Sequence, residues 1–365
     1  MVEKYYLCQK IYGIEIQEKI KMLFKKLDIS EQRKVLHELE FKSKVMVSNA
    51  KIMPVSSCPY CDSKRLSKNG HRGAVQRYKC KDCQKIFSGT TGTFIHGIKD
   101  REKFERYLKI MIEHYLPLKE MAAKVGISIQ TAFDWRHKIL SGLRNSPEVF
   151  KGITEIDDVW FLYSQKGRKG LKYSRKRGGS HRQGDNKYQV KLLITADRQK
   201  HKDLSVVKIG RITKADIQRT IGGKFDENSV LVSDRHRSIA SFAKSEGIQH
   251  KSFKASKHTA GGDFHIQTVN NYSSRLKRII NQDLRGVSTK YLQNYSNWFG
   301  EMEEIKSQQD GHKVVKRTLL KKRDTWNKFV NTEKGYKKFI KSYSERTYRC
   351  PTQRKWSSNI CINKG

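Results

Sequence analysis

Apolar positions in the middle of the chain follow two periods, which predict strands and helices in alternation. The run Val230-Leu231-Val232-Ser233-Asp234 is short, apolar and closed by an acid, as expected of a buried strand with a carboxylate at its C-terminal end. Residues 188–196 and 204–209 have the same β-forming character, and a helical pattern starts near Lys214. Apolar residues between 269 and 280 recur at helical spacing. Periodicity alone therefore predicts an α/β fold.

A further predicted strand, residues 153–161, carries acids at its centre. Alternation along the strand places Glu155 and Asp157 on one face and Asp158 on the other. An acid among β-forming residues is unusual and suggests a chemical purpose. Asp157 is the preferred candidate, and Glu155 and Asp158 are the alternatives.

Three other polar residues complete a candidate site with Asp157. Asp234 ends its strand, where it is a candidate ligand or, alternatively, a turn or helix cap. Asn270 and Lys277 are seven residues apart, so both lie on one side of the predicted helix, whereas Asn271 points about 100° away. Carboxylate and amide oxygens suit Mg²⁺, and two such ions about 4 Å apart can activate an attacking oxygen and stabilise a leaving one. The pattern is typical of metal-dependent phosphoryl transfer.

Two Cys-x-x-Cys pairs separated by eighteen residues predict a zinc ribbon. A closed site of four thiolates folds its module and performs no catalysis. Lys68-Asn69-Gly70 is the expected hairpin turn between the two pairs. Cys8, Cys350 and Cys361 stand alone and are interpreted as ordinary thiols. The predicted ligands of structural Zn²⁺ are Cys58, Cys61, Cys80 and Cys83.

The segment 118–139 predicts a helix-turn-helix, with a packing helical hairpin as the alternative. Gly126 permits the turn, and Ser128 can cap the second helix. The second helix is the one that would enter a DNA groove. The side chains expected to be exposed near the groove are Gln130, Thr131, Asp134, Arg136, His137 and Lys138.

The charge of the chain favours a polyanionic partner. Lysine and arginine outnumber the acids by 76 − 36 = +40, and this excess points to nucleic acid. A polybasic membrane binder is the alternative, but no long apolar run, amphipathic anchor or signal-peptide core accompanies the charge. We therefore expect a cytoplasmic, nucleoid-associated protein that does not enter the membrane. Phosphate contacts are expected from Arg175, Lys176, Arg177, Arg235 and Arg237.

The motifs around the acids resemble those of a known family. Asp157 in Glu-Ile-Asp-Asp, Asp234 in Leu-Val-Ser-Asp-Arg, and Asn270 followed by Lys277 look like the signature of bacterial insertion-sequence transposases. The resemblance is to the DDE group with an N-terminal zinc ribbon, in which the third position is Glu, Asn or His. It spans residues 54–304 and includes the block 285–295.

This resemblance implies an RNase H-like core that cuts and joins double-stranded DNA with Mg²⁺ or Mn²⁺. It also implies a dimer or larger assembly, because two transposon ends are brought together. An inactive DNA-binding regulator and a nuclease without joining activity are the alternatives. The expected domains are a helical segment (1–50), a zinc ribbon (51–95), a helix-turn-helix domain (96–149), a catalytic domain (150–304) and a basic C-terminal extension (305–365).

Overall fold

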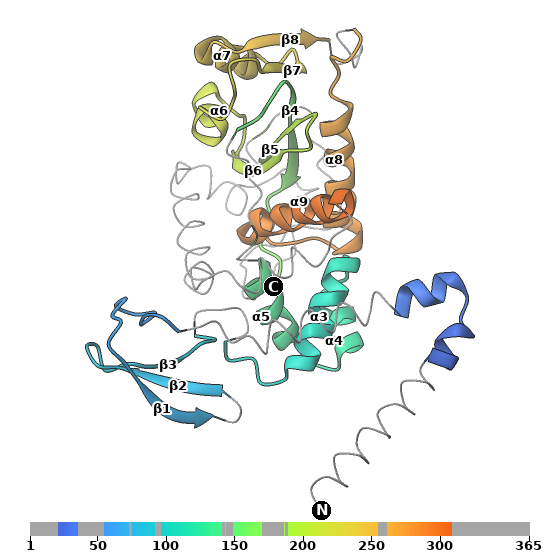
Figure 1. The fold of residues 1–365 in the computed structure, drawn as a ribbon. Coiled ribbons are helices and arrows are strands. Elements are labelled where there is room, and N and C mark those ends of the chain that lie inside the picture. The colour runs from blue at the N-terminus through green and yellow to red at the C-terminus, as the bar shows by residue number, and fades with distance from the viewer. Residues whose placement is uncertain are drawn as a thin grey trace, which may run out of the picture. The chain divides into compact units, whose positions relative to one another are not determined.

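The computed structural model divides the chain into two compact units, Met1–Gly89 and Thr90–Gly365 (Figure 1). The first unit contains a short helical segment and a small sheet, and the second contains a group of helices and a larger sheet. The residues that the structure describes are 21–35, 55–72, 75–91, 96–140, 143, 149–169, 186, 189–254 and 261–308.

The first unit begins its described part with helical residues 21–25 and 29–35. Asp28 and Glu31 cap the second of these reciprocally: Asp28 Oδ1 accepts the Glu31 N–H at 2.9 Å, and Glu31 Oε2 accepts the Asp28 N–H at 3.2 Å. These described residues are helical, as expected for the predicted N-terminal helical segment. The rest of the predicted N-terminal helical segment lies outside the described residues.

A three-stranded antiparallel sheet follows, with strands β1 (Leu66–Arg72), β2 (Val75–Cys80) and β3 (Ile86–Ser88). The turn predicted at Lys68-Asn69-Gly70 is wrong. These residues lie inside β1, where the register with β2 shifts between Lys68 and His71. Gly70 has φ of 62°, a conformation that glycine adopts without steric cost. The glycine therefore belongs to a bulge in β1 and not to a turn between strands.

The second unit opens with α3 (Arg101–Glu113), α4 (Leu118–Val125) and α5 (Ile129–Leu140). Gly126 ends α4 in the left-handed conformation, at φ of 70°. Ser128 Oγ then accepts the Thr131 N–H at 3.0 Å and so caps α5. Both features were expected from the sequence. The buried residues of α4 are Met121, Ala122 and Val125.

Buried hydrogen bonds connect α3 with α5 and with α9 (Leu292–Gln308). The Tyr107 hydroxyl of α3 donates to the Ala132 carbonyl of α5 at 2.7 Å. Trp298 of α9 donates its indole N–H to the Met111 carbonyl at 3.2 Å. Because both hydrogen bonds are buried, α3 and α5 are tied to each other and to α9.

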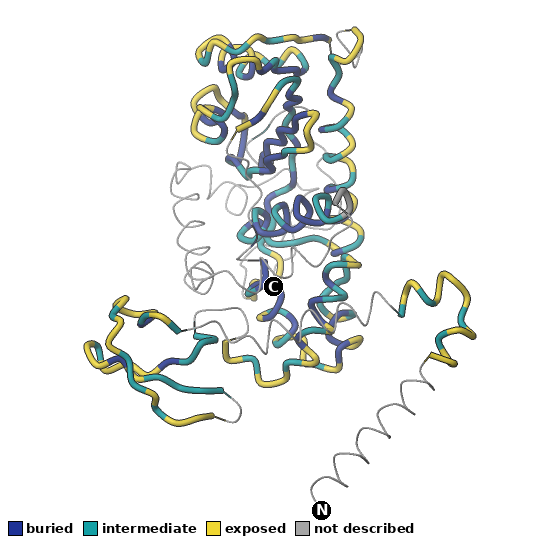
Figure 2. The backbone as a smooth tube through the Cα atoms, in the orientation of Figure 1, coloured by how far each residue is buried: buried dark blue, intermediate teal, exposed yellow. Residues whose placement is uncertain are grey.

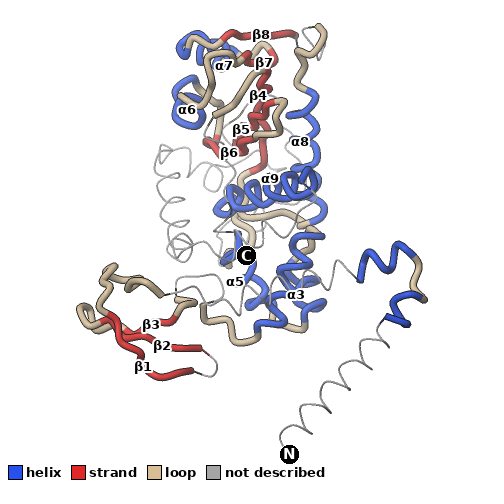
Figure 3. Tube along the Cα trace, in the orientation of Figure 1, coloured by secondary structure: helices blue, strands red, loops and turns tan. Residues whose placement is uncertain are grey.

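A five-stranded sheet in the order β6-β5-β4-β7-β8 forms the centre of the second unit (Figures 1 and 3). The central strand β4 pairs antiparallel with β5 and parallel with β7, and β8 extends the sheet parallel to β7. These strands confirm the predicted α/β fold; β4, β5, β6 and β7 lie within two residues of the predicted boundaries, and β8 was not predicted. Their bounds are β4 Ile153–Leu162, β5 Gln189–Asp197, β6 Lys202–Ile209, β7 Val230–Asp234 and β8 Gln249–Phe253.

Helices cover both faces of this sheet. On one face, α6 (Lys214–Ile221) and α7 (Arg237–Glu246) share an apolar core with Ile156 of β4. The neighbouring residue Glu155 points to the other face, where it contacts α8 (Gln267–Arg278). Every residue of β5 is buried, and Figure 2 shows the dark blue of buried residues concentrated where Figure 1 labels β4 and β5. Such two-sided burial explains the continuous apolar run that predicted this strand.

A five-residue π-helical turn at Ile279–Asp283 and a short 3₁₀ turn at Thr289–Tyr291 connect α8 to α9. In the described part of the chain, no helix combines the length and the apolar character of a membrane span. The basic C-terminal extension predicted beyond residue 304 lies outside the described residues, except for the end of α9.

Candidate active site

Asp157 and Asp234 occupy equivalent positions on adjacent parallel strands. Glu155 of β4 is paired with Val232 of β7, and the two aspartates each follow two residues later. Neighbouring strands are about 4.8 Å apart, and side chains two residues apart share a face. The two carboxylates therefore leave the sheet at the same level and on the same face.

Electrostatics distinguish Asp157 from its neighbour Asp158. Burial, followed by the nearby charges of Asp158 and Asp234, raises the pKa of Asp157 to about 7. Asp158 has its own cation, because Lys191 Nζ lies 2.6 Å from Asp158 Oδ2. A cation bound beside Asp157 and Asp234 would offset the repulsion between their carboxylates, as expected at a metal site.

Asn270 and Lys277 belong to α8, which lies against β4. Both are half-buried, and the residues directly before them, Val269 and Leu276, are fully buried. Lys277 Nζ lies 5.2 Å from the centre of the Trp160 ring, so its side chain reaches β4. Asn271 is exposed and accepts a hydrogen bond from Arg275 at 3.4 Å. Of the two asparagines, Asn270 is therefore the one placed closer to the sheet.

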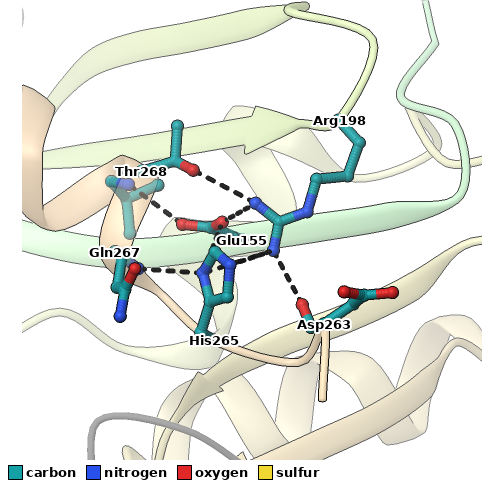
Figure 4. Close-up of polar contacts among 7 residues, drawn as sticks. Glu155, Arg198, Asp263, His265, Gln267 and Thr268 are labelled. Atoms are coloured by element: carbon teal, nitrogen blue, oxygen red, sulfur yellow. Dashed lines mark hydrogen bonds and ion pairs between the residues drawn. The ribbon is translucent and has the colours of Figure 1, made fainter.

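Glu155 has a different role from its neighbouring acids. Its side chain is 0% exposed and forms an ion pair with Arg198, and its Oε2 accepts the Val269 N–H at 3.0 Å (Figure 4). His265 Nδ1 lies 3.4 Å from its Oε1. Glu155 was only an alternative in the sequence interpretation, and Arg198 was missed, because its turn position carries no motif. These contacts make Glu155 a poor candidate for a metal ligand.

Asp234 also closes a turn. Its Oδ1 accepts the His236 N–H at 3.1 Å, so the capping role considered from the sequence is present. Arg235 and Arg237 follow Asp234 at the start of α7. Both are exposed and therefore accessible to phosphate. The other three cations expected to bind phosphate, Arg175, Lys176 and Arg177, lie outside the described residues.

The expected exposure of Arg136 and His137 on α5 is wrong. Each is 1% exposed. Arg136 donates to the Leu116 carbonyl at 2.8 Å and lies over the Trp298 ring, 5.6 Å from its centre. His137 packs against the ring of Tyr291 at 4.0 Å, and burial lowers its pKa to about 3. Both polar residues face α9 because they share the inward side of α5 with its apolar residues.

The remaining groove candidates lie at or near the surface of α5. Gln130 is exposed and donates to Asp134 Oδ1 at 2.9 Å, and Thr131 is half-buried. Lys138 is half-buried, donates to the His96 carbonyl at 2.6 Å, and has its pKa lowered to about 8 by burial. Gln130, Thr131 and Asp134 therefore form the accessible end of this helix.

The four predicted zinc ligands lie together in the first unit. All four Sγ atoms are within 4.8 Å of one another, and Cys58–Cys83 and Cys61–Cys80 are each 3.6 Å apart. A tetrahedral site with Zn–S bonds near 2.3 Å requires sulfur atoms about 3.8 Å apart. Hydrogen bonds from the backbone of Cys83 and then Asp82 lower the pKa of Cys80 to about 6, which favours the thiolate. The cluster fits a zinc ribbon.

Comparison with known proteins finds a transposase domain in this chain. Residues 149–300 match the ISXO2-like transposase domain. A protein in the transposable element ISH50 of Halobacterium salinarum, described as uncharacterized, is 25% identical over 273 residues, which cover 72% of this chain and 91% of that protein.

Two solved structures also resemble the chain weakly. A pre-cleavage Mos1 transpososome covers 67% of this chain and 79% of its own, with 10% identity and a TM-score of 0.21. A Mos1 transposase paired-end complex with the left transposon end covers 60% and 80%, with 12% identity and a TM-score of 0.19. TM-scores this low do not establish a shared fold. The domain match and the ISH50 relative together support an insertion-sequence transposase of the DDE superfamily.

Proposed function

We propose that this chain is an active DNA transposase, which cleaves strands at the ends of its element and joins them to target DNA. Asp157, Asp234 and Asn270 would hold Mg²⁺ or Mn²⁺, and Lys277 would bind phosphate next to the scissile bond. The proposal draws on the transposase family and on the placement of the two aspartates.

The observation that carries this proposal is the equivalent position of Asp157 and Asp234 on β4 and β7. Two carboxylates on one face of adjacent strands repel each other, and the pKa of Asp157 is raised by burial first, then by the charge of Asp158 and by this repulsion from Asp234. Divalent ions held by such carboxylates can activate the attacking oxygen and stabilise the leaving oxygen of a phosphodiester. Asn270 would add a neutral oxygen ligand, as Mg²⁺ sites allow.

The arrangement of the sheet supports an RNase H-like core. In the order β6-β5-β4-β7-β8, the central strand has one antiparallel and one parallel neighbour, and the candidate acids come from this strand and its parallel neighbour. The carboxyl ends of adjacent parallel strands are the usual place for a site in open α/β sheets. Asp234 at the carboxyl end of β7 follows this rule, and Asp157, in the middle of β4, lies beside that end.

Two modules are proposed to bind DNA. The α4-turn-α5 arrangement would act as a helix-turn-helix, with Gln130 and Thr131 near base edges. The cysteine cluster would hold structural Zn²⁺, with its basic surroundings on phosphate. The net charge of +40 favours such a polyanionic partner. We expect a dimer or larger assembly at the nucleoid, since two DNA ends must be joined.

A strand-transfer assay tests this function directly. Purified protein is incubated with the DNA flanking its gene and Mg²⁺ or Mn²⁺, beside Asp234→Asn and Asn270→Ala. Joined products that disappear in Asp234→Asn would support the proposal, and activity that survives Asn270→Ala would remove Asn270 from the ligand set. Specific binding without cleavage would indicate a regulator, and breaks without joined products would indicate a nuclease.

A further inference from the structure

The first turn of α8 is capped by a side chain from another element. The residue before the helix is Ile266, whose side chain makes no capping hydrogen bond. The Val269 N–H, in the first turn, instead donates to Glu155 Oε2 of β4 at 3.0 Å. A carboxylate at this position satisfies a backbone donor that the helix leaves open and interacts favourably with the helix dipole.

Arg198 extends this cap to the segment that leads into α8 (Figure 4). Its guanidinium forms an ion pair with Glu155 and donates through Nη1 to Thr268 Oγ1 at 3.1 Å. Through Nη2 it donates to the Asp263 carbonyl at 2.8 Å, and the His265 ring lies 3.3 Å away. A planar guanidinium with several fixed donors can hold such partners in one geometry, which a lysine could not.

The cap lies next to two proposed metal ligands. Glu155 is two residues before Asp157 on the same face of β4, and Val269 directly precedes Asn270. The hydrogen bond between Glu155 and Val269 therefore fixes how far α8 is shifted along its axis, and how it is rotated, relative to the strand that carries Asp157. A shift of α8 by one residue would turn Asn270 by about 100°.

We propose that Glu155 and Arg198 are positioning residues that hold Asn270, and with it Lys277, against the Asp157–Asp234 pair. This inference rests on the proposed function, because it concerns the metal site assigned there. A neutral asparagine attracts a divalent ion less than a carboxylate does, so its contribution depends strongly on placement. Glu155 acts through the backbone of α8 and does not bind the metal, since Arg198 already offsets its charge.

Mn²⁺ affinity, measured by titration calorimetry, tests the inference. Arg198→Gln is expected to weaken the Asp234-dependent Mn²⁺ site by roughly 10- to 100-fold, as the loss of a supporting contact does at other metal sites. Thr268→Val, which removes one acceptor for Arg198, is a milder second variant with a smaller loss in the same direction. Arg219→Gln, an exposed arginine paired with Asp216 on the opposite face, is the matched control and keeps wild-type affinity.

A double-mutant cycle separates positioning from general destabilisation. If Arg198 acts through Asn270, Arg198→Gln causes little further loss of Mn²⁺ affinity in the Asn270→Ala background. Urea unfolding of each variant confirms that the compared proteins are folded. A merely structural role would give losses that add, and this result would overturn the inference.

The remaining outcomes distinguish this inference from the proposed function. Wild-type Mn²⁺ affinity in folded Arg198→Gln, or in Thr268→Val if the former does not fold, would overturn the positioning role while leaving the metal site intact. A wild-type protein with no Mn²⁺ site that depends on Asp234 would overturn both the proposed metal site and the inference.

Discussion

Lys191 and Asp158 form an ion pair inside the central sheet, with Nζ 2.6 Å from Oδ2. The lysine side chain is 3% exposed and the aspartate side chain 15%. This pair separates the roles of two consecutive acids, because Asp158 has a cation while the pKa of Asp157 is raised by burial and neighbouring carboxylates. The protein thus keeps two acids on opposite faces of β4 in different electrostatic states.

Removing the lysine is expected to destabilise the fold strongly. In Lys191→Met, Asp158 would remain buried without this partner, at a cost of about 3–5 kcal/mol in the free energy of unfolding. Urea unfolding in the absence of metal measures this loss. The matched control is Arg219→Gln, which breaks a pair with a largely exposed arginine and should cost less than about 1 kcal/mol. Equal losses in the two variants would refute the importance of the buried pair.

Two substitutions on α5 are expected to affect different properties of the protein, its stability in one case and its DNA specificity in the other. Arg136→Met should lower stability, by an amount on the order of 1–3 kcal/mol, because the Leu116 carbonyl loses its buried donor. Gln130→Ala should leave stability within about 0.5 kcal/mol and reduce discrimination between DNA sequences, since Gln130 is exposed. Thermal unfolding and competition binding with specific and nonspecific DNA measure the two effects. Reduced DNA specificity in a fully stable Arg136→Met protein would contradict the assignment of Arg136 as a buried structural residue.

Buried His137 makes stability depend on pH. The folded protein holds the pKa of His137 at about 3, below its ordinary value of 6.5. The unfolded chain therefore binds a proton in this range that the folded chain does not, and stability falls as the pH drops from 6.5 towards 3. This contribution has a slope of at most about 1.4 kcal/mol per pH unit.

His137→Phe retains an aromatic ring against Tyr291 and removes the titrating group. As the pH falls from 7 to 5, the free energy of unfolding of the variant should therefore rise relative to that of the wild type. Urea unfolding at these two values tests the expectation. A difference that does not change with pH would show that the pKa of His137 is the same in the folded and unfolded states.

Local patterns predicted four of the five strands well, because these strands are buried or end in a distinctive acid, whereas the largely exposed β8 was not predicted. The β5 run and the strand ending at Asp234 are examples. The pattern could not show that Arg136 and His137 face α9, since their burial depends on contacts with Trp298 and Tyr291, more than 150 residues later in the sequence. Helical periodicity identifies the apolar positions that face the core. It does not identify a polar side chain that is buried because a distant part of the chain supplies its partner.

The candidate site shows the same limit. Asp157, Asp234 and Asn270 stand in motifs, so sequence reasoning could select them, whereas Arg198 lies in a turn between two strands. Its importance arises only when the turn is brought next to Glu155 and the start of α8. The ambiguity at Lys68-Asn69-Gly70 is similar, because a glycine with positive φ serves a bulge as well as a turn.

The cysteine cluster predicts one Zn²⁺ per chain and a metal-dependent fold of the first unit. Cys80→Ser removes one of four ligands and should abolish stoichiometric zinc, because a structural site of this kind requires all four. Elemental analysis measures the zinc, and limited proteolysis reports the order of residues 55–91. Cys361→Ser is the control, since this cysteine has no neighbouring pair in the sequence. Full zinc content in Cys80→Ser would contradict the four-cysteine site.

Lys277 is expected to contribute one phosphate contact, with its ammonium group directed by the Trp160 ring. The ammonium group lies 5.2 Å from the centre of the Trp160 ring, a favourable cation–π distance that directs the lysine towards β4. If Lys277 binds phosphate there, Lys277→Gln should weaken DNA binding and reduce the slope of log affinity against log salt concentration by about 1. Fluorescence anisotropy at several salt concentrations measures this slope.

Trp160→Leu tests whether the ring directs the lysine. The variant retains Lys277, so its salt slope should stay close to that of wild type, while strand cleavage should slow because the ammonium group is less well placed. Lys244→Gln, on α7 on the opposite face of the sheet, serves as a control for the loss of one basic residue. If Lys277→Gln and Lys244→Gln change cleavage equally, Lys277 contributes only to the general positive charge, and its assignment to the active site is wrong.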